Sequence, residues 1–157
     1  MHVEIMPNGY LQIDGARIAH RNFEGLKTPY NAEGDRNFSL IIDDQEVYEA
    51  LVKEGWNVKI KPPRDEDEEP FMFMKVNVKC NDFGPIARLV SGRNVEKLTP
   101  DTLKRLDRIR IASVDLDIRP YDWNFNGKTG RSAYLHSIVV TQRVEDRFAS
   151  RFEEIEE

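Results

Sequence analysis

The 157-residue sequence predicts a mostly β fold, because short runs with an apolar residue at every second position outnumber segments with helical spacing. Only 43–55 and 98–109 space their apolar residues as a helix does. Strands open the chain, helices interrupt it, and a hairpin follows toward the C-terminal end. This order matches an OB-fold-like five-stranded barrel with additional strands and two short helices.

Composition favours a soluble protein of one main domain. Hydrophobic residues make up 39% of the chain and charged residues 32%, and the length is sufficient for a buried core. No apolar run approaches the roughly 20 residues that span a bilayer, and no secretory signal opens the chain. The single cysteine, Cys80, excludes an internal disulfide and fits a reducing compartment. We therefore expect a cytoplasmic protein.

Charge is unevenly distributed along the chain. The net charge is −5, but 65–69 and 143–157 together hold 11 of the 28 acidic residues and only three of the 23 basic ones. The remainder holds 20 basic and 17 acidic residues and so carries +3. A local basic surface is therefore compatible with the acidic total. We expect one domain over 1–142 and an acidic, flexible tail over 143–157.

The N-terminal segments predict a hairpin and then a long loop. Alternating residues at 10–13 and 16–23 flank Asp14-Gly15, a pair typical of tight hairpin turns. The polar segment 24–36 contains Gly and Pro and predicts a mobile loop. A further strand is expected at 37–43.

The first helix is predicted over 43–55. Asp43 is its expected N-cap, and Glu46 would complete a capping box. A strand at 57–61 follows, with Ile60 on its core face.

The second half of the chain predicts two strands, a second helix and a hairpin. Thr99 is the expected cap of the helix, and Pro100 takes its first position, where a missing N–H costs nothing. These elements lie at 71–80, 85–90, 98–109, 113–123 and 131–141, with Asn126-Gly127 in the hairpin connection.

The strand at 71–80, FMFMKVNVKC, has an unusual outer face. One side is an ordinary core face and carries Met72, Met74, Val76, Val78 and Cys80. The other side puts two phenyl rings in line with two lysines, and carries Phe71, Phe73, Lys75, Asn77 and Lys79.

The first strand of the C-terminal hairpin repeats this combination. Its core face carries Val114, Leu116 and Ile118, and the opposite face carries Arg119, Tyr121, Trp123 and Phe125. Pro120 is compatible with a bulge that would break the register. If the register stands, two strands present rings and cations away from the core.

Unpaired nucleic-acid bases give a physical reason for such a surface. A base stacked on an exposed ring contributes about 1–3 kcal/mol, and lysine or arginine beside the rings pairs with phosphates and releases counterions. The Gly-rich connection 124–131 would form a finger over the strand. The candidate DNA-binding residues are Phe71, Phe73, Lys75, Lys79, Lys59, Lys61, Arg119, Tyr121, Trp123, Phe125, Lys128 and Arg131.

Structural roles are the alternative for each group. Phe71 and Phe73 would equally suit a sheet face covered by a helix. Tyr121 and Trp123 would suit the end of a barrel core or a homodimer contact. Single lysines on strands often serve only to discourage edge pairing.

Catalytic and metal-binding patterns are missing from the sequence. The acidic run 65–69 lacks the alternating spacing and central Gly of a calcium loop. His2, His20 and His136 are scattered, and neither a phosphate-binding Gly-rich loop nor a nucleophile elbow occurs. We therefore expect no cofactor, no metal and no enzyme, with a metal-dependent nuclease as the weakest rival.

Several segments resemble a phage-encoded single-stranded DNA-binding protein family that is common in tailed phages of Gram-positive hosts. They are 13–25, 33–44, 55–70 and 114–140. The resemblance implies an OB-fold, binding of single strands without sequence preference, and service in phage DNA replication or recombination in the host cytoplasm. Which aromatic and basic residues touch DNA does not follow from it.

Partners other than DNA are expected at the tail and at the aromatic surface. Cellular single-strand binders end in an acidic tip closed by Pro-Phe, whereas this chain ends in EEIEE. An acidic tail of this kind would recruit replication or recombination proteins. A second interpretation makes the protein a β-barrel interaction module that docks a replisome or virion partner through Tyr121, Trp123 and Phe125.

Overall fold

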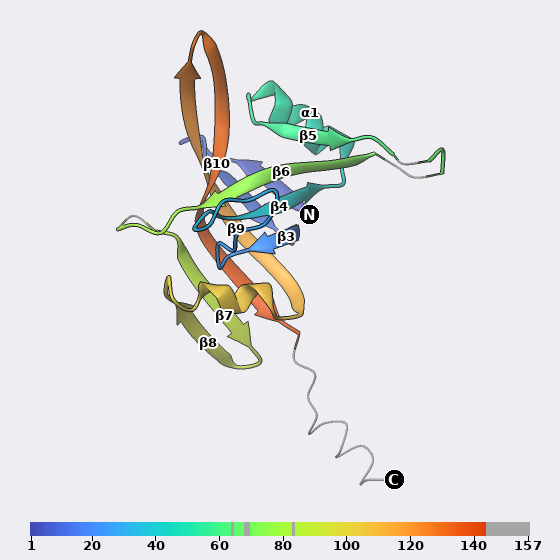
Figure 1. Cartoon of the computed structure of the whole chain (residues 1–157). Helices are drawn as coiled ribbons and strands as arrows, with labels where there is room; N and C mark the ends of the chain where they lie inside the picture. The colour runs from blue at the N-terminus through green and yellow to red at the C-terminus, as the bar shows by residue number, and fades with distance from the viewer. Residues whose placement is uncertain (64, 68–69, 83, 144–157) are drawn as a thin grey trace.

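The computed structural model describes residues 1–63, 65–67, 70–82 and 84–143. Within them, ten strands join in one sheet with the order β1-β2-β9-β10-β6-β4-β3, from which β5 branches at β6 and the β7–β8 pair branches at β10 (Figure 1). The elements are β1 (His2–Ile5), β2 (Leu11–Asp14), β3 (Arg17–Asn22), β4 (Arg36–Ile42), α1 (Gln45–Lys53), β5 (Val58–Lys61), β6 (Phe71–Val78), β7 (Ile86–Ser91), β8 (Asn94–Leu98), the 3₁₀ helix η1 (Leu103–Asp107), β9 (Ile111–Phe125) and β10 (Lys128–Gln142).

The β9–β10 hairpin forms the centre of the sheet and contains its two longest strands. Each strand has 15 residues, and the Asn126-Gly127 turn between them has positive φ angles of 50° and 77°. Two such residues are what a two-residue hairpin turn matching the sheet twist requires. The predicted hairpin is therefore confirmed, and its tip projects beyond the body of the sheet (Figure 1).

Strand β10 brings distant parts of the chain together. Its middle pairs in parallel with the end of β6, through Ala133 and Tyr134, and residues 137–141 pair in parallel with β7. On the far side of β9 lies β2, which in turn pairs with β1. As a result, β9, β10 and β6 lie side by side although β6 and β9 are far apart in sequence.

The core follows the alternation that the sequence predicts. Leu116 and Ile118 of β9 and Val76 of β6 are buried. Phe23 and Phe38 are fully buried and stack with ring centroids 5.2 Å apart. The mostly β class is thus confirmed, and the residues between these positions are left for the opposite face of the sheet.

The sheet curls but does not form the predicted five-stranded barrel. The backbone N–H of Ala16, just before β3, donates to the carbonyl oxygen of Val114 in β9 at 2.7 Å. Arg21 donates to the carbonyl oxygens of Leu106 and Ile109. One backbone bond thus joins the start of β3 to β9, and side-chain bonds join β3 to the η1 segment, where a closed barrel would have a continuous ladder; the sheet stays open.

The predicted second helix over 98–109 is wrong. Leu98 still belongs to β8, and only Leu103–Asp107 forms a helical segment, of the 3₁₀ type. The hydroxyl of Thr102 accepts the N–H of Thr99 at 2.7 Å, so the expected cap residue is itself part of a turn.

Three smaller predictions near the N-terminus also need correction. Strands β2 and β3 do not pair across Asp14-Gly15; β2 pairs with β1, and the N–H of Gly15 donates to Asp115 instead. The N-cap of α1 is Asp44, whose carboxylate accepts the N–H of Glu46, and not Asp43. Ile60 is 49% exposed, because β5 is a short edge strand.

The loop between β3 and β4 is held by its own side chains. The amide of Asn31 donates to the carbonyl oxygens of Leu26, Ala32 and Asp35. Gly25 has a φ of +78°, and a Cβ there would lie 3.0 Å from the backbone of Gly34. The segment expected as a mobile loop is thus closed by a defined hydrogen-bond network.

Among the described residues, no helical segment has the length and apolar character that a bilayer crossing requires. The predicted acidic tail lies almost wholly outside the described residues, as do positions 68 and 69 of the acidic run.

Candidate nucleic-acid interface

Strand register brings the two aromatic and basic stripes onto one face of the sheet. In β10, Tyr134 lies opposite Arg119 of β9 on one side and opposite Asn77 of β6 on the other. Residues directly opposite each other in a sheet point to the same face. Arg119 and Asn77 belong to the two stripes that the sequence singles out, so Tyr134 joins them. We call this side of β9, β10, β6 and β5 the outer face.

Strand β5 extends the outer face with two cations. Lys59 lies opposite Phe73, and Lys61 lies opposite Phe71. Both lysines are exposed, as are Lys75 on β6 and Lys79 directly after this strand. Three of the predicted cations, Lys59, Lys61 and Lys75, therefore lie near the two rings, and Lys79 lies past the far end of β6.

The predicted aromatic residues differ in how open they are. Phe71 and Phe73 are half-buried and pack against each other with centroids 5.6 Å apart, and the ring of His20 lies edge-on to Phe71 at 6.4 Å. On the hairpin, Tyr121 is 54% exposed, Trp123 39% and Phe125 70%. The hairpin rings thus offer more open surface for stacking than the two phenylalanines.

Tyr134 is a candidate that the sequence analysis missed. The guanidinium carbon of Arg119 lies 5.7 Å from its ring centroid, and Tyr121 approaches it edge-on at 5.8 Å. The local signal was present, since Tyr134 stands between the buried Ala133 and Leu135. Tyr134 joins the two stripes only because β6 lies next to β10, and the sequence pattern of a single strand does not reveal this pairing.

The indole of Trp123 packs against its partner strand at Gly130. Gly130 is directly opposite Trp123 in the hairpin, and a Cβ on Gly130 would come within 2.3 Å of the indole ring. Only a glycine leaves space for the ring in this position. One face of the indole is therefore supported, and beside it lies a hollow of about 490 Å³ that Glu54 and Gly55 also line.

Pro120 does not disturb the hairpin register. It lies opposite Ala133, and the register shifts only further along, between Leu135 and Ser137 and between Thr141 and Gln142. The alternation that places Tyr121 and Trp123 on the outer face therefore continues through Pro120.

Arg131 is engaged within the protein. Its Nε donates to Asp122 at 2.7 Å and its Nη1 to the carbonyl oxygen of Glu54 at 2.7 Å. Its guanidinium carbon also lies 5.5 Å from the ring centroid of Trp56, which is buried. These contacts tie the base of the hairpin to the segment after α1, and they occupy the group that the sequence analysis placed among the DNA contacts.

The ion pair between Asp122 and Arg131 shifts both pKa values. The hydrogen bond from Arg131 holds the pKa of the Asp122 carboxyl below its ordinary value, although partial desolvation opposes the shift. The same bond raises the pKa of Arg131. Since the folded pKa of Asp122 is the lower one, its contribution to stability is present above the unfolded pKa and is lost as pH falls through the folded pKa.

We therefore expect the carboxyl of Asp122 to titrate at a lower pH than an ordinary aspartate. Replacing Arg131 with methionine, which keeps a long side chain over Trp56, should raise the pKa of Asp122 toward its ordinary value. Carboxyl-detected NMR titration of both proteins measures this. An unchanged Asp122 titration in Arg131→Met would show that the bond from Arg131 is not the cause.

A second hollow, of about 430 Å³, lies beside Tyr134 on the outer face. Asn77 of β6 and Lys79 directly after it line one side, and Asp35 at the end of the β3–β4 loop and Arg36 at the start of β4 line the other. Arg36 is tethered there through its bond to the carbonyl oxygen of Pro100. The described residues contain no cluster of three or more His, Cys, Asp or Glu side chains placed to hold a metal ion.

Comparison with known proteins matches the chain to one family over nearly its whole length. The family model described as "Putative phage ssDNA-binding domain" matches residues 2–157. The search among curated proteins finds no match.

Two solved structures with a similar fold are of a protein from bacteriophage Enc34. The single-stranded DNA-binding protein from bacteriophage Enc34 in complex with ssDNA has a TM-score of 0.59 and 12% sequence identity, and the match covers 91% of this chain and 92% of that chain. A second structure of the single-stranded DNA-binding protein from bacteriophage Enc34 has a TM-score of 0.56 and 13% sequence identity, and the match covers 97% of this chain and 93% of that chain. At these identities the likeness shows a shared fold.

Proposed function

The chain belongs to the phage ssDNA-binding domain family, and we propose that it binds single strands across the outer face without reading their sequence. The observation that carries this proposal is the position of Tyr134, which lies between Arg119 and Asn77 and joins the two stripes. A structurally similar phage protein has been solved with ssDNA, which supports the same use of the fold here.

On this surface, aromatic rings would stack on the bases and lysines would contact the phosphates. Tyr121, Trp123 and Tyr134 offer ring faces or edges to unpaired bases, each worth about 1–3 kcal/mol. Lysines beside them pair with phosphates, which every nucleotide carries, so the contact does not depend on sequence. The lysines proposed for this role are Lys59, Lys61, Lys75, Lys79 and Lys128.

Three of the predicted residues, all phenylalanines, receive a different role. Phe71 and Phe73 would form the half-buried floor of the interface beside Lys61 and Lys59. Phe125, at the exposed tip of the hairpin, would contact DNA that passes over the finger.

Binding of this kind suits a protein that coats single strands during phage DNA replication or recombination. We propose that it works in the cytoplasm of the host cell, as a binding protein and not as an enzyme. We further propose that the acidic C-terminal segment recruits replication or recombination proteins. We also propose that the protein assembles on the strand as a homodimer.

The fluorescence of Trp123 tests the proposed surface. Trp123 is 39% exposed on the outer face and Trp56 is 3% exposed in the core, so oligo(dT) should quench only the former. In a Trp56→Phe background we expect quenching that saturates with oligo(dT) and weakens as salt rises. The matched Trp123→Phe protein, which keeps Trp56, should show almost none. Equal quenching in the two proteins would contradict a role for this face.

A further inference from the structure

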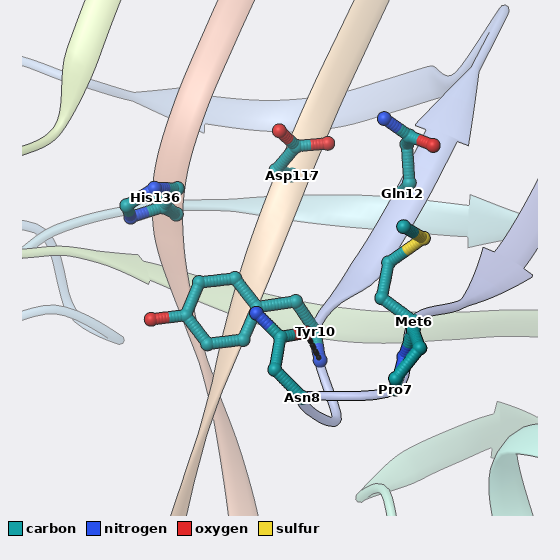
Figure 2. A pocket seen from close by; sticks show the side chains of 7 residues that line it. All are labelled: Met6, Pro7, Asn8, Tyr10, Gln12, Asp117 and His136. Carbon is teal, nitrogen blue, oxygen red and sulfur yellow. Dashed lines mark hydrogen bonds between the residues drawn. The ribbon is translucent and has the colours of Figure 1, made fainter.

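A pocket at the β1–β2 end of the sheet has the features of a base-binding site. It has a volume of about 440 Å³ and is shown with its lining side chains in Figure 2. The turn between β1 and β2 forms one wall and is closed by the N–H of Met6 donating to the carbonyl oxygen of Tyr10 at 2.8 Å. Its lining residues are Met6, Pro7, Asn8, Tyr10, Gln12, Asp117 and His136.

This pocket continues the outer face. Asp117 precedes Arg119 by two residues on β9 and so points to the same side of the sheet. His136 follows Tyr134 by two residues on β10, at the register shift between Leu135 and Ser137. Such shifts often redirect a side chain beside a functional site. Here the shift accompanies a His136 ring that meets Tyr10 edge-on, with centroids 5.1 Å apart.

The polar groups of the pocket suit the edge of a base and not a phosphate. Asp117 accepts the hydroxyl of Ser137 through Oδ2 at 3.0 Å, which fixes the carboxylate and leaves Oδ1 without a bond in the described structure. A carboxylate repels phosphate, so a strand passing this point would have to present a base. Gln12 is the direct cross-strand neighbour of Asp117, and its amide can donate to a base carbonyl.

We propose that this pocket is a subsite that selects guanine within an otherwise unselective interface. Guanine has two neighbouring donors on its Watson–Crick edge, N1–H and the 2-amino group, and a carboxylate can accept both. Its O6 acceptor lies beside them, where the amide of Gln12 can donate. Thymine, cytosine and adenine lack this pair of donors. The rings of Tyr10 and His136, with Met6, give the base an apolar wall.

The proposal rests on single strands following the outer face, and its test separates the two ideas. Fluorescence anisotropy would compare oligo(dT) with the same oligonucleotide carrying one central deoxyguanosine or one central deoxyinosine, which lacks the 2-amino group. For the wild-type protein we expect the guanine-containing strand to bind about fivefold more tightly than oligo(dT), as a bidentate base contact implies. The inosine strand should lose most of that gain.

Variants of two aspartates on the same strand complete the experiment. Asp117→Asn should abolish the guanine preference while binding oligo(dT) at least as well, because a negative charge has been removed. Asp115→Asn removes the same charge from the same side of β9, outside the pocket, and its amide oxygen can still accept the N–H of Gly15. It should keep the preference.

Equal affinity of the wild-type protein for all three strands would refute the guanine subsite and leave the outer face in place. A preference that persists in Asp117→Asn would refute the assignment to this carboxylate. Failure of the protein to bind oligo(dT) at all would refute the proposed function and the subsite together.

Discussion

Replacing Lys75 and Lys79 together with glutamate should lower the affinity for oligo(dT) by about 100-fold at low salt, since two contacts to charged phosphates become repulsive. Both lysines are exposed, Lys75 on β6 and Lys79 directly after it, on either side of Asn77, and neither belongs to the core. The loss should be the same for every sequence, because phosphates carry no sequence information.

The salt dependence of binding gives a second, quantitative check. Each phosphate contact to a single strand contributes about 0.7 to the slope of log K against log salt concentration. The slope of the Lys75→Glu, Lys79→Glu protein should therefore be shallower by about 1.4 than that of the wild type. Anisotropy titrations at several salt concentrations measure both quantities at once.

A matched control keeps the change in net charge and moves it to another part of the molecule. Arg93 lies in the β7–β8 turn and Lys104 in η1, and both are exposed. Arg93→Glu with Lys104→Glu should bind nearly as the wild type does. A similar loss in both double variants would mean that overall charge, and not a lysine track on β6, governs binding. Wild-type affinity in the β6 variant would favour the interaction module that docks a partner through apolar contacts.

The sequence predicted those parts of the fold that depend on local chemistry. Asn126-Gly127 specifies the hairpin turn, and the alternation along β6 and β9 separates core from outer face. The segment 98–109 was expected to be one helix, but the buried Leu103 and Leu106 are three residues apart, which is the period of the short 3₁₀ helix that forms there.

Strand partners outside the C-terminal hairpin could not be predicted, because their pairing is decided by the whole chain. Asp14-Gly15 looks like a hairpin turn, yet β2 is completed by β1 and β9. The parallel contact of β6 with β10 joins two segments separated by β7, β8, η1 and β9. For the candidate site this has a direct consequence. The rings and lysines were found from the alternation of side chains along single strands. Tyr134 and the pocket around Asp117 could be recognised only once it was known which strands lie side by side.

Replacing Gly130 with valine should weaken binding as much as removing the indole of Trp123, although it leaves every aromatic and basic residue in place. The added Cβ would lie 2.3 Å from Cζ2 of Trp123, so the ring must leave the strand on which it rests. Loss of one stacked base predicts a fall in affinity of about 10- to 100-fold. Valine is well suited to a strand, so the hairpin itself should persist.

Three variants separate the position of the ring from the stability of the hairpin. Trp123→Ala should bind as weakly as Gly130→Val, and Thr129→Val, one residue away on the opposite side of β10, should bind like the wild type. Thermal unfolding of each protein shows whether the fold is kept. Wild-type affinity in Gly130→Val would mean that the packing of Trp123 against Gly130 does not contribute to DNA binding. A folded Trp123→Ala protein with undiminished affinity would remove the indole from the interface, and the strand would then have to bind through Tyr121, Tyr134 and the lysines of β6.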